Sequence, residues 1–93
     1  MSYHLKLKTG FFKKEPIEME VFDNELVLET VSKKRIVINV EEILHIDVIN
    51  KYQSPELEIQ TKDHNYIVCL DDLSQEQEIY SNLSRFFKDK FKH

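Results

Sequence analysis

The chain has 93 residues, a mass of 11.2 kDa and a net charge of −4, which suits one domain spanning residues 1–93. A single glycine, Gly10, excludes a glycine-rich phosphate loop, and a single cysteine, Cys69, excludes a disulfide framework or a cysteine-based zinc finger. No apolar run reaches the roughly 20 residues of a membrane span, and the first residues alternate rather than forming the apolar core of a secretory signal. We therefore expect a soluble protein of the cytoplasm.

Composition favours β-structure. Alanine and tryptophan are absent, whereas valine and isoleucine together number sixteen. Branched side chains lose rotamer freedom on a helix but fit a pleated surface, and alanine is the best helix former. The sequence thus indicates a mostly-β fold with a packed core.

From about residue 3 to residue 70, apolar and polar residues alternate in seven short runs separated by turn residues. Alternation with a period of two is typical of strands with one buried and one wet face. The apolar members of the runs are Leu5 and Leu7; Ile17, Met19 and Val21; Leu26 and Leu28; Ile36, Ile38 and Val40; Leu44, Ile46 and Val48; Leu57 and Ile59; and Tyr66, Val68 and Leu70. Seven such strands predict an antiparallel sandwich or partly open barrel, divided four plus three.

The last segment changes to a helical period. Ser74 and Gln77 have the spacing of a capping box, which predicts a helix start. The apolar residues that follow form one helical stripe: Ile79, Tyr80, Leu83, Phe86, Phe87 and Phe91. We expect an amphipathic helix over about residues 75–91 that buries this stripe against the sheet.

Neither a catalytic nor a metal site is predicted. The four histidines share no close spacing: His4, His45, His64 and His93. His45 and Asp47 would lie on one strand face, but two ligands are too few for a tetrahedral zinc site. No metal and no cofactor are therefore expected. Paired glutamates, such as Glu56 and Glu58, most simply mark the wet face of a strand. Cys69 has no basic neighbour in sequence and is expected to be an inert thiol, buried or half-buried, instead of a nucleophile.

Charge is segregated along the chain, and basic residues gather in two predicted turns. In an antiparallel meander alternate connections share one end of the sheet, so Lys13 and Lys14 should meet Lys33, Lys34 and Arg35. Such a cluster could hold an anionic headgroup, a phosphate or an acidic peptide. The alternative is that these side chains only solvate exposed turns. Nucleic acid is not favoured, because net charge is negative and no aromatic residues interleave the basic ones.

The order of seven strands and one C-terminal amphipathic helix resembles the pleckstrin-homology-like (PH-like) superfold, in particular its small bacterial and GRAM-like members. Two stretches carry the likeness. In residues 35–47 (RIVINVEEILHID) a strand ends in a short acidic corner that starts a second sheet. In residues 57–70 (LEIQTKDHNYIVCL) a hairpin leads into the helix.

The resemblance implies two surfaces. In PH-like domains the turn between strands six and seven joins the basic end, which would add Lys62 and His64. Related domains also bind peptides by adding a strand between strand five and the helix, a groove that His45, Asp47 and Ile49 would border. The alternative is that the helix or the following loop covers these residues.

The sequence therefore predicts a non-catalytic binding module of the bacterial cytoplasm. Its expected partner is another protein, or a second copy of the chain, bound through a sheet edge. The second hypothesis is an anionic ligand or acidic membrane surface bound at the basic turn end.

Overall fold

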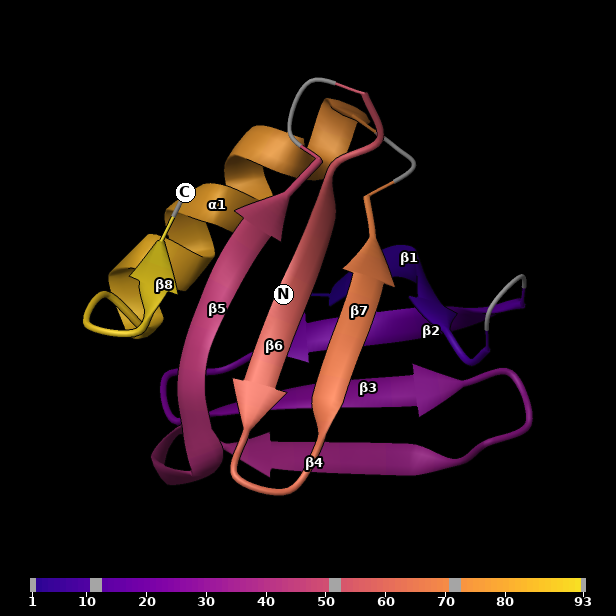
Figure 1. The fold of residues 1–93 in the computed structure, drawn as a ribbon, viewed down its shortest axis with the longest axis horizontal. Coiled ribbons are helices and arrows are strands. Elements are labelled where there is room, and N and C mark those ends of the chain that lie inside the picture. The colour runs from indigo at the N-terminus through magenta and orange to yellow at the C-terminus, as the bar shows by residue number, and fades with distance from the viewer. Residues whose placement is uncertain (1, 11–12, 51–52, 71–72, 93) are drawn as a thin grey trace.

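The computed structural model describes residues 2–10, 13–50, 53–70 and 73–92. Seven antiparallel strands and one C-terminal helix make up most of it, as the sequence predicts (Figure 1). In chain order the elements are β1 (Ser2–Lys8), β2 (Lys14–Val21), β3 (Glu25–Thr30), β4 (Arg35–Asn39), the 3-10 turn η1 (Val40–Glu42), β5 (Ile43–Ile49), β6 (Glu56–Thr61), β7 (Asn65–Cys69), the 3-10 turn η2 (Leu73–Gln75), α1 (Glu76–Phe86) and β8 (Phe91–Lys92).

The strands form one curled sheet in the order β4-β3-β2-β1-β7-β6-β5-β8. The first four are the predicted meander. A short pairing of Lys6 with Cys69 and of Leu7 with Val68 joins this meander to the second group of strands. In Figure 1, β5, β6 and β7 cross in front of the first group, so the two halves of the sheet face each other across the core. The sheet has two ends, β4 and β8.

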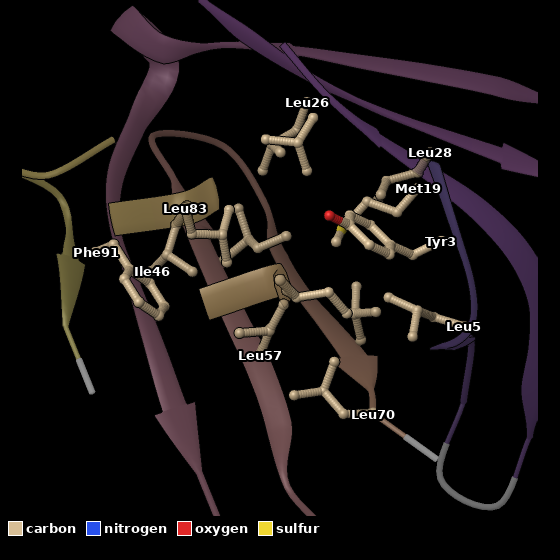
Figure 2. Close-up of a cluster of buried hydrophobic side chains, with 14 of the residues drawn as sticks. Tyr3, Leu5, Met19, Leu26, Leu28, Ile46, Leu57, Leu70, Leu83 and Phe91 are labelled. Carbon is tan, nitrogen blue, oxygen red and sulfur yellow. The ribbon is translucent and has the colours of Figure 1, made fainter. Parts of the chain in front are cut away.

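The core lies between the two halves of the sheet and is sealed by α1. Figure 2 shows Leu26 and Met19 of the first half opposite Ile46 and Leu57 of the second, with Leu83 of the helix beside them. All five side chains are fully buried. Dense packing of this kind supplies most of the stability of a small domain.

A polar contact also crosses this core. The side-chain amide of Asn82, on α1, donates a hydrogen bond to the hydroxyl group of Tyr3, on β1. Both residues are buried. The contact therefore links the helix to the first half of the sheet across the core.

The C-terminal segment differs from the prediction. The helix begins at Glu76 after the N-cap residue Gln75, so the capping box expected on Ser74 is wrong. It ends at Phe86 instead of continuing to Phe91. The helical stripe overestimated its length because Phe91 is also buried, but from β8, a two-residue strand parallel to β5.

The start of β5 also departs from simple alternation. The pairing with β6 shifts between Ile43 and His45, which marks a β-bulge. Ile43 is therefore buried, and Leu44, which the alternation placed in the core, is 53% exposed. After the bulge His45, Asp47 and Ile49 share the outer face of the sheet, away from the core.

Candidate functional site

The two basic turns lie at the same end of the first half of the sheet. Lys14 begins β2, and the pairing of Ile17 with Thr30 brings the β3–β4 turn alongside that start. The hydroxyl group of Ser32 donates a hydrogen bond to Oε1 of Glu15 across 3.5 Å, which links the two segments directly. Lys13 and Lys33 are both exposed there.

The β3–β4 turn is held by Thr30. Its Oγ1 accepts the backbone N–H of Lys34 at 3.1 Å and lies 2.9 Å from the hydroxyl group of Ser32. Lys33 has a φ of 70°, in the left-handed region that is costly for residues other than glycine. The turn therefore fixes the backbone beneath Lys33 and Lys34, and Arg35 follows at the start of β4.

A shallow groove of about 240 Å³ opens at this end. Its lining residues are His4, Leu5, Pro16, Ile17, Glu18, Glu29, Thr30, Val31 and Lys33. Glu18 and Glu29 are directly paired between β2 and β3. Lys33 thus shares the groove with two carboxylates, whose charge opposes an anion.

Lys62 and His64 do not join this basic end. They lie in the turn between β6 and β7, where Oγ1 of Thr61 accepts the backbone N–H of His64 at 2.9 Å. Figure 1 shows that turn at the lower edge of the molecule, whereas the β1–β2 and β3–β4 turns lie at the right. The reason is that β6 and β7 cross the strands of the first half instead of running beside them.

The predicted groove along β5 is occupied by the chain itself. After α1 the backbone carbonyl of Phe87 accepts the N–H groups of Lys90 and Phe91, both at 2.8 Å, which turns the chain back. Ile46 then pairs with Phe91, and its N–H donates to the carbonyl of Lys90 at 2.7 Å. The ring of Tyr80, on the helix, lies 5.9 Å from the ring of Phe91. The expectation that a peptide strand could add between strand five and the helix is thus wrong at Ile46 and Asp47, where the segment after the helix pairs with β5.

The predicted groove residues lie instead on the outer face of the sheet. His45, Asp47 and Ile49 are half-buried there, on the side of β5 away from the core. Nε2 of His45 lies 3.2 Å from Oδ2 of Asp47. These three residues therefore do not border a peptide site between β5 and the helix.

The opposite end of the sheet is open. In the described part of the chain, β4 pairs with β3 and with no strand on its far side. The N–H of Thr30 donates to the carbonyl of Lys34, and the N–H of Val40 donates to the carbonyl of Asn24. Because peptide groups alternate in direction along a strand, those of the odd-numbered residues, with Val37 at their centre, face outward.

Side chains leave this β4 edge accessible. Val37 is 46% exposed, and Arg35 and Asn39 on either side of it are exposed as well. The N–H of Asn39 is held by Oε1 of Glu42 at 3.2 Å, which ends the free stretch. An edge of this kind, short but unpaired, can accept a further strand.

Sequence reasoning missed a buried carboxylate on the outer face. Glu56, expected to be solvated, is only 5% exposed. Its carboxylate forms a salt bridge with Nζ of Lys8 at 2.8 Å. It also accepts hydrogen bonds from Nδ2 of Asn50 at 3.1 Å and from the thiol of Cys69 at 3.6 Å. Burial alone would raise the pKa of Glu56, but the hydrogen bond and charge of Lys8, with the other donors, hold that pKa below its usual value. The same contact raises the pKa of Lys8.

This cluster stabilises the junction between the two halves of the sheet, since its members come from β1, β6, β7 and the loop after β5. Its donors satisfy the carboxylate, so it offers no reactive group. Nothing in the sequence near residue 56 could have revealed it, because Lys8 and Cys69 are brought to Glu56 only by strand pairing.

Comparisons with known proteins address the fold. No protein-family model and no curated protein sequence matches this chain. Among solved structures, the chain is similar to one in the structure of the Spt16D Pob3N heterodimer, with a TM-score of 0.70 and 13% identity over 95% of this chain. The match spans 50% of that other chain. Together with the strand order and the C-terminal helix, it supports a PH-like fold.

The described part of the chain holds no helix with the length and apolar character needed to cross a membrane.

Proposed function

We propose that residues 1–93 act as one PH-like domain, a non-catalytic binding module of the bacterial cytoplasm that pairs with another protein strand through the β4 edge. The observation that carries this proposal is the contrast between the two ends of the sheet. The β5 side is occupied by β8, whereas the outward peptide groups of β4 have no partner strand in the described part of the chain. Strand addition at such an edge supplies affinity through main-chain hydrogen bonds.

A second copy of the chain fits this edge. If two β4 strands pair antiparallel about Val37, the outward peptide groups of both meet, and Arg35 of one copy lies opposite Asn39 of the other. No like charges face each other in that register. The arrangement is two-fold symmetric, which is the most common symmetry of protein assemblies. The solved structure described above is of a heterodimer, which supports a protein partner for this chain.

Sedimentation velocity of two variants tests the proposal. Val37→Pro removes an N–H group that faces outward, so the β3–β4 pairing loses no hydrogen bond but the edge can no longer accept a strand. Val37→Thr keeps both the N–H group and the branched side chain. We expect the wild-type chain and Val37→Thr to associate and Val37→Pro to be monomeric. A proline variant that associates like the wild type would exclude β4 as the interface.

The second candidate is an anionic ligand or acidic membrane surface at the basic turn end. The shared location of Lys13, Lys14, Lys33 and Lys34 supports it, while Glu18 and Glu29 in the adjacent groove oppose it. Flotation with acidic liposomes at low salt discriminates the two functions. Binding that is lost when the four lysines are changed to glutamate, and that weakens with salt, would favour this candidate over strand pairing.

A further inference from the structure

Three potential metal ligands meet on the outer face of β5 and β6. His45, Asp47 and Glu58 each offer one ligand atom, and these three atoms all lie within 4.8 Å of one another. Asp47 and Glu58 are directly opposite each other in the antiparallel pair, and His45 is two residues along on the same face. The sequence placed two of these ligands on one strand, and the fold supplies the third from the neighbouring strand.

The geometry is close to what a small divalent cation requires. Around a tetrahedral zinc ion with bonds of about 2.0–2.2 Å, neighbouring ligand atoms lie roughly 3.3 Å apart. Nε2 of His45 and Oδ2 of Asp47 are already 3.2 Å apart. The ligand atom of Glu58 lies within 4.8 Å of both.

The surroundings favour a bound cation in two further ways. Directly opposed carboxylates on paired strands repel each other, which destabilises the pair. A cation between Asp47 and Glu58 would replace this repulsion with attraction. The side-chain amide of Asn65 donates to Oε2 of Glu58 at 3.1 Å, which orients the carboxylate. All three side chains are half-buried, so the pair of strands limits their motion while solvent still has access.

We propose that His45, Asp47 and Glu58 bind one divalent transition-metal ion of the zinc type. An imidazole with two carboxylates suits zinc and its neighbours in the first transition row better than magnesium or calcium, which prefer oxygen ligands alone. Three protein ligands leave at least one position for water or for a group from another molecule. The inference is independent of strand pairing at β4, because the two surfaces lie at opposite ends of the sheet.

Equilibrium dialysis of the tag-free chain against zinc chloride, in a buffer that does not chelate metals, tests this proposal. We expect one zinc ion per chain. Affinity should fall at least about tenfold in His45→Ala, Asp47→Asn and Glu58→Gln, and by about tenfold in Asn65→Ala, which loses the orienting amide. The paired His4 and Glu18, on the outer face of β1 and β2, give a matched control, since His4→Ala and Glu18→Gln should leave zinc binding unchanged.

A second readout does not depend on the affinity measurement. Cobalt(II) added in place of zinc should give visible absorption bands with the wild-type chain and with His4→Ala, and lose them with His45→Ala. Circular dichroism should confirm that the conservative variants Asp47→Asn and Glu58→Gln fold. The proposal is overturned if the wild-type chain takes up no zinc, if uptake survives in His45→Ala, or if uptake depends instead on His64 or His93.

Discussion

Among the described residues Glu56 is the only buried side chain with a formal charge, and its contacts with Lys8, Asn50 and Cys69 predict a specific response to acid. Its pKa is lower in the folded chain than its ordinary value of 4.5. A depressed carboxyl pKa stabilises the fold at pH values above the ordinary value, and that contribution is lost as pH falls through the folded value. Removing the charge of Glu56 should therefore lower the stability of the fold at neutral pH and have no effect on it in acid.

We expect Glu56→Gln to lower the free energy of unfolding by about 1–3 kcal/mol at pH 7, since it weakens a charged hydrogen-bond network in a buried site. The difference from wild type should shrink as pH is lowered below about 4.5. Urea unfolding at a series of pH values measures both effects. Glu20→Gln, on a half-buried position without such contacts, should change stability by less than about 0.5 kcal/mol throughout. A difference that stays constant with pH would show that the charge of Glu56 is not the source.

The contact between Asn82 and Tyr3 makes a second prediction for single residues. Asn82→Ala leaves the buried Tyr3 hydroxyl without its amide donor, which we expect to cost about 1–3 kcal/mol. Tyr3→Phe removes the other side of the contact, and the double variant should be less destabilised than the sum of the two single ones. Ser81→Ala, exposed on the same helix, is the control. Additive effects, measured by chemical denaturation, would refute the coupling between helix and sheet.

The secondary-structure elements differ in how far the sequence predicts them. The strands were predictable because alternation of apolar and polar residues, as in Leu5 and Leu7, has one simple solution when a sheet covers a core on one side. The end of the helix could not be predicted in the same way. Phe87 and Phe91 extend the helical stripe. However, an apolar residue in this pattern can be buried either on a helix or on a strand that follows it, and the pattern does not distinguish the two.

Sites assembled across strands were the least predictable features. Glu58 completes the metal ligand set only because it stands opposite Asp47 in the pairing of β5 with β6. The position of Lys62 depends on the angle at which β6 and β7 cross the first half of the sheet, and no local sequence pattern contains that angle. The shared end of Lys13 and Lys33, in contrast, follows from meander topology alone and could be predicted.

The segment after the helix makes a prediction about β5. Phe91 is 8% exposed and lies beside Ile46 and Leu83 in Figure 2. Replacing a buried phenylalanine with alanine leaves a cavity, so we expect Phe91→Ala to cost about 3 kcal/mol. It should also speed hydrogen exchange at the amide of Ile46, which donates to Lys90, more than at amides of β2. Lys88→Ala, on an exposed position of the same segment, should leave both measurements unchanged. Equal exchange rates at Ile46 in Phe91→Ala and wild type would show that β8 does not protect this edge.

At the scale of the whole molecule, the two ends of the sheet determine how large an assembly can become. A sheet with two open edges can add copies at both and grow without limit, whereas a sheet with one open edge closes when two copies meet. Here the end strand β8 has only two residues and offers little edge for a further strand, whereas β4 has five residues and no strand on its far side within the described part of the chain.

We therefore expect self-association through β4 to stop at a dimer. Sedimentation equilibrium at increasing concentration should reach a plateau at twice the 11.2 kDa mass of the chain and no higher. Phe91→Ala, by loosening β8, should allow species larger than the dimer, and combining it with Val37→Pro should remove association through β4 while leaving association through β5. A mass that rises beyond the dimer in the wild-type chain would mean that the β8 end is also used, and a chain that stays monomeric at every concentration would mean that the β4 edge does not bind a second copy.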